Sequence, residues 1–236
     1  MRVFSGILAG GSGTRMESSR MPKQFLEVEG IPVLIRTLNT FLSVEKIEKI
    51  IIAINTDWKD TYHELLVRHG IDLSRIDLVP GGSSRFASLC SVVRRAAEFD
   101  RNGVIVTHDC ARIFCTKRII EENISAMESQ RIVTTSIPVI DTILESEDGV
   151  SSASVPDRSR LWADQGPQTF YIDDFLKYAE KIPLEEMDAF VEAGKLFLVN
   201  GHSVGIVKGD RQNFKITNDI DLQYAEFLIE RGLVKA

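Results

Sequence analysis

The sequence predicts an α/β protein with a mostly parallel sheet and helices on both of its faces. Short apolar runs of strand length alternate along the chain with segments whose apolar residues recur at helical spacing. A glycine-rich segment directly follows the first apolar run, as in α/β proteins that bind ligands at the carboxyl ends of their strands. The length of 236 residues suits one domain, and we expect that domain to span residues 1–236.

The alternation defines the expected elements in chain order. The first strand, 3–8, is an apolar run that ends at the glycine-rich segment. Further strands are expected at 49–54, 76–79, 103–107, 133–139 and 203–207. Helices are expected at 32–41, 57–69, 85–99, 117–127, 173–181, 184–193 and 219–230. Strands that alternate with helices favour a parallel sheet, because parallel neighbours need a crossover connection.

Residues from about 140 to 164 interrupt this alternation. The segment is polar and rich in Ser and Asp, and it contains only short β-like patches. A stretch of this length without clear elements is unusual inside a compact domain. It is therefore expected to be either an arm that protrudes from the domain or a loose surface loop.

Composition and charge exclude several classes of function. The formal net charge is −6 and no block of Lys and Arg occurs, so nucleic-acid binding is not expected. No apolar run approaches the ~20 residues of a membrane helix, and residues 1–8 are too few for a signal peptide. The three cysteines (Cys90, Cys110 and Cys115) lack the spacing of a metal site. We expect a cytoplasmic protein without a membrane partner.

The strongest site signal is the glycine-rich segment itself. It comprises Leu8, Ala9, Gly10, Gly11 and, after a serine, Gly13. Glycines allow backbone N–H groups to approach an anion closely. A strand that ends in such a loop is therefore a candidate phosphate site.

Two cations follow the loop, Arg15 and then Lys23 in a Pro-Lys-Gln segment. Full positive charges beside exposed N–H groups suit a triphosphate. A dinucleotide fingerprint needs a third glycine where Met16 stands, and the Gly-Lys-Ser/Thr of a Walker A loop is absent. An ordinary strand-to-helix turn with surface cations is the alternative.

A second candidate segment, 81–88, follows a strand and opens a helix with the sequence Gly-Gly-Ser-Ser-Arg-Phe-Ala-Ser. Its backbone amides, together with Ser88, are suited to hold a base or a ribose. The alternative is that Ser83 or Ser84 simply caps the helix.

A third candidate, Asp109, ends a strand within Thr-His-Asp-Cys-Ala-Arg at 107–112. A carboxylate at this edge of a sheet is well placed to contact Mg²⁺ or a ribose hydroxyl. Alternatively, Asp109 caps the next turn and pairs with Arg112. We expect His108 to support the loop, and Cys110 has no evident partner for nucleophilic chemistry.

Two more segments carry isolated cations. Arg158 and Arg160 lie in 157–162, where they either grip a phosphate or form a solvated surface. Lys215 precedes a helix that Thr217 is suited to cap, and an anion is favoured there. A plain lysine at a helix terminus is the alternative.

Together, these segments resemble the 2-C-methyl-D-erythritol 4-phosphate cytidylyltransferases and their relatives, the ribitol 5-phosphate cytidylyltransferases, nearly end to end. The resemblance implies a Rossmann-like nucleotidyltransferase fold, CTP and Mg²⁺, and a homodimer whose protruding β-arm, 140–164, helps to build the partner's site. It implies a nucleotide site formed by Leu8, Ala9, Gly10, Gly11, Gly13, Gly82, Arg85, Ser88 and Asp109, with Asp109 also at the metal. The implied catalytic residues are Arg15, Lys23 and Lys215. The implied acceptor-binding residues are Arg112, Asp141, Arg158, Val191 and Glu192.

The sequence departs from the family pattern on the acceptor side. Ile113 stands where a proline is usual, Gly166 where Thr-Pro-Gln usually begins, and Val191 and Glu192 where a Thr-Asp pair often holds the acceptor. Val191 cannot donate a hydroxyl hydrogen bond. These departures leave the acceptor open, although Val191 could contact a methyl group.

The expected acceptor is D-ribitol 5-phosphate, with 2-C-methyl-D-erythritol 4-phosphate as the alternative. Segments 6–11, 106–109 and 118–124 resemble the ribitol branch more closely. The acceptor phosphate has a second pKa near ~6, so its dianion needs neither a general base nor a covalent enzyme intermediate. The enzyme must bring two anions together and stabilise charge on the α-phosphate.

Two other classes of function stay open from the residues alone. An NAD-dependent oxidoreductase would share the strand, glycine loop and helix, but the missing third glycine and the paired cations count against it. A nucleotide-binding regulatory protein without catalysis would have no use for cations that converge on the α-phosphate.

Overall fold

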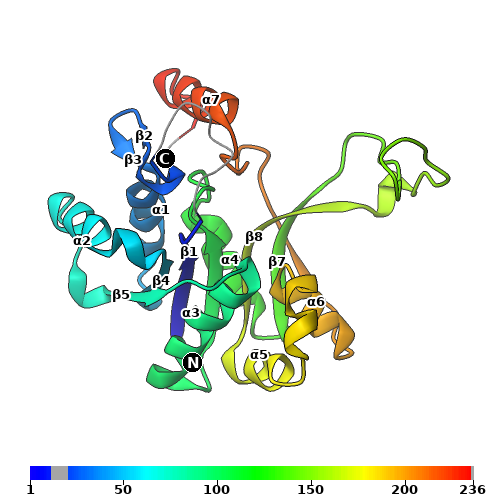
Figure 1. Cartoon of the computed structure of the whole chain (residues 1–236), viewed down its shortest axis with the longest axis horizontal. Coiled ribbons are helices and arrows are strands. Elements are labelled where there is room, and N and C mark those ends of the chain that lie inside the picture. The colour runs from blue at the N-terminus through cyan, green and yellow to red at the C-terminus, as the bar shows by residue number, and fades with distance from the viewer. Residues whose placement is uncertain (12–20, 235–236) are drawn as a thin grey trace.

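The computed structural model describes residues 1–11 and 21–234, which form a seven-stranded sheet between two layers of helices (Figure 1). The strands are β1 (Val3–Leu8), β4 (Ile47–Ile54), β5 (Ile76–Pro80), β6 (Val104–Asp109), β7 (Ile132–Pro138), β8 (Trp162–Tyr171) and β9 (Gly205–Lys208). Their order is β5-β4-β1-β6-β8-β7-β9. Only β8 runs antiparallel to its neighbours in this sheet, so the prediction of a mostly parallel sheet is confirmed.

The helices are α1 (Val33–Leu42), α2 (Lys59–Arg68), α3 (Arg85–Asp100), α4 (Lys117–Ala126), α5 (Ile172–Ala179), α6 (Ala193–Val199) and α7 (Asp219–Glu230). A short hairpin, β2 (Glu27–Val28) and β3 (Ile31–Pro32), precedes α1. None of the helices in the described part of the chain combines the length and the apolar character needed to cross a bilayer.

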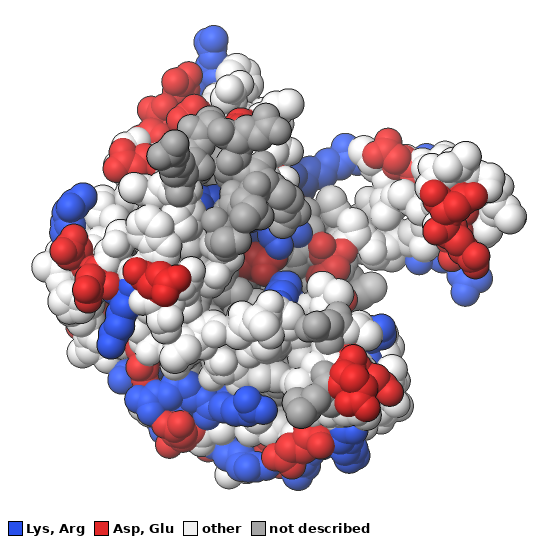
Figure 2. Space-filling view, in the orientation of Figure 1, with Lys and Arg blue, Asp and Glu red and all other residues white. Residues whose placement is uncertain are grey.

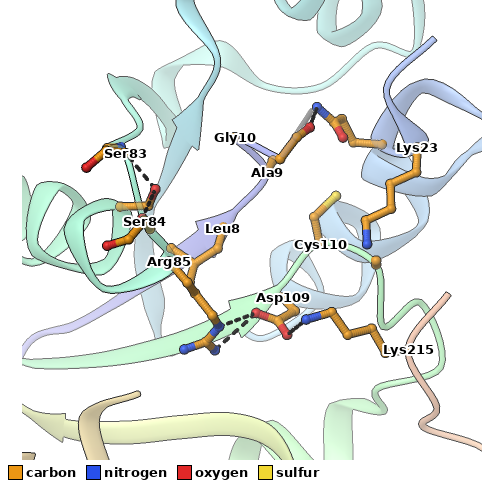
Figure 3. A pocket seen from close by; sticks show the side chains of 15 residues that line it. Leu8, Ala9, Gly10, Lys23, Ser83, Ser84, Arg85, Asp109, Cys110 and Lys215 are labelled. Atoms are coloured by element: carbon orange, nitrogen blue, oxygen red, sulfur yellow. Dashed lines mark hydrogen bonds and ion pairs between the residues drawn. The ribbon is translucent and has the colours of Figure 1, made fainter. Parts of the chain in front are cut away.

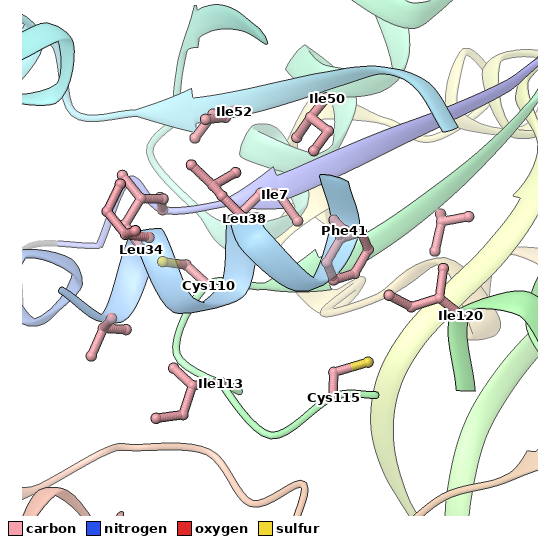
Figure 4. Close-up of a cluster of buried hydrophobic side chains, with 14 of the residues drawn as sticks. Ile7, Leu34, Leu38, Phe41, Ile50, Ile52, Cys110, Ile113, Cys115 and Ile120 are labelled. Atoms are coloured by element: carbon pink, nitrogen blue, oxygen red, sulfur yellow. The ribbon is translucent and has the colours of Figure 1, made fainter. Parts of the chain in front are cut away.

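Alternating side chains on the strands build two separate cores. In β4, Ile50 and Ile52 pack against α1, α2 and α4, whereas Ile51 and Ala53 pack against α3 on the other face. The first core also buries Phe41 and the cysteine thiols beside β6 (Figure 4). Burial on both faces explains why the central strands are nearly continuous apolar runs, and it confirms the expected helices on both sides.

Strand β8 was not expected. Its sequence carries Asp, Gln, Gly and Pro in the middle, which hides the alternation of a strand and makes a central position look unfavourable. It nevertheless lies between β6 and β7, with register shifts where it pairs with β7 around Thr134 and Ser136. Residues 162–164, expected to belong to the arm, are part of this strand.

The prediction of a helix at 184–193 was wrong. Leu184–Ala189 form a short 3-10 helix, and α6 begins only at Ala193 because Glu192 is extended, with φ −153°. The buried residues Leu196 and Phe197 then anchor α6 in the second core. Tertiary packing, rather than local propensity, sets the position of this helix.

The segment between β7 and β8 protrudes from the domain (Figure 1). It is held at its base by the hydrogen bond from Val139 N to Leu161 O, and farther out by one isolated bridge between Glu145 and Ser154. It is therefore the expected arm rather than a loop lying on the surface.

Candidate active site

Two adjoining cavities open where β1 and β6 end. The larger, about 400 Å³, is lined by residues 8–11, by 82–85 at the start of α3, by 109–111, and by single side chains including Lys23 and Lys215. The smaller, about 170 Å³, lies beside β8. Acidic and basic side chains meet in a hollow at the centre of this face (Figure 2). Arg85, Asp109 and Lys215 line both cavities, so the two spaces meet at these side chains.

The glycine segment is fixed from behind by a short hydrogen-bond chain. Tyr62 donates to Ala9 O at 2.6 Å, and Gln24 donates to the Tyr62 hydroxyl at 2.9 Å and to Gly11 O at 3.2 Å. Burial raises the pKa of Tyr62, so its hydroxyl stays protonated as a donor. Sequence reasoning missed Tyr62 and Gln24, because nothing local marks their contact with the loop.

The loop itself leaves open space on the cavity side. A Cβ added at Gly11 would meet no heavy atom of the described residues within 4 Å, and one at Gly10 would meet only ordinary contacts of 3.6 Å or more. Packing against the described residues therefore does not require glycine at these two positions. Close approach of a ligand to the backbone is the reason that fits both of them.

Gly82 differs, because packing requires it. A Cβ there would lie 2.3 Å from the Cβ of Ala87 in the first turn of α3. Ser84 caps that turn by accepting from Ala87 N, as the capping alternative expected, while Gly82 N donates to the Ser88 hydroxyl at 3.0 Å. The segment is thus both a helix cap and part of the cavity wall.

Asp109 lies between two cations (Figure 3). Its Oδ1 is 3.0 Å from Arg85 Nη2, and its Oδ2 accepts from Lys215 Nζ at 2.6 Å. Burial alone would raise the pKa of Asp109, but the charges of Arg85 and Lys215 outweigh this effect and hold the pKa well below its usual range. The alternative pairing of Asp109 with Arg112 was wrong, since the Arg112 guanidinium donates instead to Asn213 O at 2.8 Å.

The two predicted catalytic lysines approach the larger cavity from opposite ends of the chain. Lys23 Nζ donates to Ile216 O at 3.2 Å, next to Lys215. The segment that carries Lys215 is held by Ile216 N, which donates to Ala111 O at 2.9 Å. Lys23, Arg85 and Lys215 thus bring three cations to one cavity of a protein whose net charge is negative.

The smaller cavity brings together Arg112, Val191 and Glu192, three of the predicted acceptor-binding residues. It also contains Asp164 and Gln168 of β8, which sequence reasoning did not single out for this site. Burial, with the neighbouring Asp164 carboxylate, raises the pKa of Glu192 to about 8. The departures from the family pattern at 191 and 192 therefore lie in one cavity with an unpredicted acid.

Neither His108 nor Cys110 is poised for proton transfer or nucleophilic attack. Complete burial lowers the pKa of His108 to about 4, and its Nε2 lies 3.0 Å from Arg112 O, so the neutral ring donates to that carbonyl. Burial raises the pKa of the Cys110 thiol to about 12. Both side chains support the turn after β6, as the sequence indicated for His108.

The remaining predicted residues lie elsewhere. Asp141 and Arg158 are exposed on the arm, where Arg158 donates to Ile140 O at 2.6 Å, and they line neither cavity of their own chain. Gly13 and Arg15 lie outside the described residues. Within the described ranges, no cluster of three or more His, Cys, Asp or Glu is suited to hold a metal ion.

Comparisons with known proteins match this architecture along nearly the whole chain. The family model of 2-C-methyl-D-erythritol 4-phosphate cytidylyltransferase (IspD) matches residues 3–231. Ribitol-5-phosphate cytidylyltransferases of Streptococcus pneumoniae strains CGSP14 and G54 are each 35% identical over 233 residues, covering 97% of this chain and 99% of theirs.

Solved structures share the fold. The 4-diphosphocytidyl-2C-methyl-D-erythritol synthase of Anaerococcus prevotii superposes with a TM-score of 0.80 at 25% identity, covering 97% of this chain and 96% of that one. The 2-C-methyl-D-erythritol 4-phosphate cytidylyltransferase of Francisella tularensis gives a TM-score of 0.81 at 21% identity, covering 96% and 99%.

The fold and these matches define a nucleotidyltransferase. More narrowly, the chain belongs to the IspD family of cytidylyltransferases. This confirms the expected Rossmann-like nucleotidyltransferase fold and the resemblance on which it was based, and it excludes the oxidoreductase alternative.

Two glycine substitutions should separate packing from ligand approach. Gly11→Ala should leave thermal stability near wild type but raise KM for CTP about tenfold or more, because the methyl group enters open cavity space. Gly82→Ala should lower the free energy of unfolding by about 1–3 kcal/mol, because the new Cβ overlaps Ala87. Thermal melts and CTP saturation curves measure both effects. A Gly11→Ala enzyme with normal KM for CTP would contradict phosphate approach at this loop.

Proposed function

We propose that this protein transfers CMP from CTP to D-ribitol 5-phosphate and releases pyrophosphate, with Mg²⁺ bound. The observation that carries the proposal is the junction of the two cavities at Arg85, Asp109 and Lys215. A nucleotide in the larger cavity and a polyol phosphate in the smaller one would meet at these charges.

The chemistry follows from this arrangement. An oxygen of the acceptor phosphate attacks the α-phosphorus of CTP, and the bond from that phosphorus to the β-phosphate oxygen breaks. Because the acceptor is already a dianion above its second pKa of ~6, no side chain has to remove a proton. The burial of His108, whose ring stays neutral, agrees with this route.

Positioned cations supply the catalysis. Lys23 and Lys215 line the same cavity as the glycine loop, so they can neutralise charge that builds up on the α-phosphate and on the departing pyrophosphate. The chain holds Lys215 ready by its pairing with Asp109, which limits reorganisation when the nucleotide binds. We assign Arg15 to the same triphosphate from the family pattern alone.

Asp109 fits a role at Mg²⁺. Mg²⁺ in proteins is commonly held by one or two carboxylates together with substrate phosphates, and Asp109 is a carboxylate facing the larger cavity. Both of its oxygens contact cations, so one ion pair must yield to the metal. Bound there, Mg²⁺ would neutralise phosphate charge and orient the triphosphate.

The acceptor assignment is supported by sequence identity to known enzymes and by the residues that line the smaller cavity. Ribitol-5-phosphate cytidylyltransferases are 35% identical to this chain along nearly its full length. Val191 is the only aliphatic side chain among the described residues that line the smaller cavity, and it is 60% exposed. A methyl branch would therefore gain little from burial there.

The second candidate acceptor is 2-C-methyl-D-erythritol 4-phosphate. It is favoured by the family model and by the activity named for the Anaerococcus prevotii synthase with the same fold. Both acceptors are small polyol phosphates, so the same cations and the same displacement serve either one.

The cation roles predict a loss of turnover. Lys23→Ala and Lys215→Ala should each lower kcat by roughly a hundredfold or more, since each removes one preorganised charge from the transition state. Lys208→Ala, which removes an exposed lysine of β9, is the matched control and should be near wild type. Steady-state pyrophosphate release measures all three. Normal turnover in both active-site variants would refute the mechanism.

The arm predicts a homodimer in which Arg158 and Asp141 serve the partner's site. The arm exposes apolar side chains at Ile140, Ile143, Leu144 and Val155, and β8 begins with the exposed Trp162. Sedimentation should give a dimer, and Arg158→Ala alone should be impaired. Co-assembly of Arg158→Ala and Lys215→Ala subunits should restore roughly a quarter of wild-type activity. Half of the dimers are then mixed, and in each mixed dimer one of the two sites has both an intact Lys215 and an intact Arg158 from the partner. A fully active monomer would contradict this prediction.

The acceptor assignment predicts a higher kcat/KM for D-ribitol 5-phosphate than for 2-C-methyl-D-erythritol 4-phosphate under identical CTP and Mg²⁺. Small-group discrimination of this kind is worth ~1–3 kcal/mol, so a preference of roughly tenfold or more is expected. A preference for the methyl-branched acceptor would overturn the assignment and leave the CTP chemistry in place.

A further inference from the structure

The smaller cavity is lined both by cations and by a pair of acids. Arg85 and Lys215 line its junction with the larger cavity. Gln168 Nε2 donates to both Asp164 Oδ2 and Glu192 Oε2, each at 2.8 Å. One amide thus holds two carboxyl groups side by side.

Both carboxyl oxygens of Asp164 accept hydrogen bonds. Its Oδ1 accepts from the Thr134 hydroxyl at 2.5 Å and from Gly166 N at 3.1 Å, and its Oδ2 accepts from Gln168. These donors lie on β7 and β8, so the sheet fixes Asp164 in place.

Glu192 accepts fewer hydrogen bonds from the described residues than Asp164 does, so it can still bind a ligand. Among the described residues, Gln168 donates a hydrogen bond to Glu192, and that bond uses Oε2. Glu192 directly precedes α6, whose first residue Ala193 donates its N–H to Gln168 Oε1 at 3.1 Å, so Gln168 contacts both the acid and the start of the helix. The other carboxyl oxygen, Oε1, is left with capacity for a further hydrogen bond.

Two neighbouring carboxylates would repel the phosphate that this cavity must admit. Burial and the adjacent Asp164 raise the pKa of Glu192 to about 8, so below that pH the pair shares one proton and carries a single negative charge. A phosphate dianion in the same cavity would favour the protonated form further.

The geometry points to a hydroxyl-binding subsite formed by Asp164, Gln168 and Glu192, which selects an unbranched, fully hydroxylated polyol phosphate as the acceptor. This inference rests on the proposed function, because it concerns the acceptor cavity of the same reaction. The acids accept hydrogen bonds from the polyol hydroxyls, and the cations at the junction take the phosphate. A methyl branch directed at these acids would displace a hydroxyl contact and leave carboxyl oxygens unpaired.

Between pH 7 and 9, the titration of Glu192 can be separated from that of the groups around it. Asp164 and Gln168 face it from β8 and Arg85 from α3, while His108, Asp109, Arg112 and Lys215 line the same cavity. The pKa of His108 is lowered to about 4 and that of Asp109 lies well below its usual range, so neither changes charge between pH 7 and 9. The acceptor phosphate titrates near ~6, below this window.

The test measures KM for D-ribitol 5-phosphate and for CTP between pH 7 and 9 in four proteins: wild type, Glu192→Gln, Glu192→Ala and the exposed control Glu185→Gln. In wild type and in the control, KM for ribitol 5-phosphate should rise about tenfold above pH 8 as the second negative charge appears. Glu192→Gln keeps a neutral side chain that donates to Asp164 and accepts from a hydroxyl, so its KM should match wild type at pH 7 and stay flat to pH 9.

Glu192→Ala should raise KM for ribitol 5-phosphate about tenfold or more at every pH, because it removes a hydroxyl contact. The Glu192→Ala variant should also have a smaller ratio of kcat/KM for ribitol 5-phosphate to kcat/KM for 2-C-methyl-D-erythritol 4-phosphate. KM for CTP should not change in any variant, since Glu192 does not line the larger cavity. Thermal melts check the fold, and the Glu192→Gln profile tests the subsite even if the alanine variant is unstable.

The outcomes separate the two proposals. If wild type transfers CMP to neither polyol phosphate, the proposed function fails. If wild type uses ribitol 5-phosphate but both Glu192 variants keep its KM and pH profile, the subsite is overturned and the proposed function stands.

Discussion

The active site depends on the burial of one carboxylate between two cations. Asp109 is only 14% exposed at its side chain, and its partners Arg85 and Lys215 come from sequence positions 24 residues before it and 106 residues after it. A buried carboxylate without partners would be strongly unfavourable, so the start of α3 and the 209–217 segment are held against the end of β6. The same ion pairs keep two like charges close together before an anionic substrate arrives.

Strand β8 connects this charge centre to the acceptor side. Thr107 of β6 donates its hydroxyl hydrogen to Gln168 O at 3.1 Å, and Asn213, next to Lys215, donates to Gly166 O at 3.1 Å. The strand that forms one wall of the smaller cavity therefore also positions the lysine segment. Because β8 leads directly from the arm, the arm is joined to a strand that lines the smaller cavity.

Much of the fold and part of the site could be predicted from the sequence. The central strands are buried on both faces, so they appear as apolar runs, and the residues at their carboxyl ends are brought together by any parallel sheet. That rule is enough to gather Gly10, Asp109 and the start of α3. It could not find β8, whose polar centre is stabilised by contacts with the ends of two other strands. It also missed Tyr62, whose partner Ala9 is 53 residues away.

Charge separation within one cleft also gives the reaction a direction. The protein is acidic overall, yet Lys23, Arg85 and Lys215 line the larger cavity, whereas Asp164 and Glu192 line only the smaller one. A polyol phosphate bound the wrong way round would place its dianion against the acids and its hydroxyls against the cations. The contact of the dianion with the carboxyl groups would be unfavourable at close range and low dielectric. In the proposed reaction, this repulsion would favour the orientation in which the acceptor phosphate faces the nucleotide.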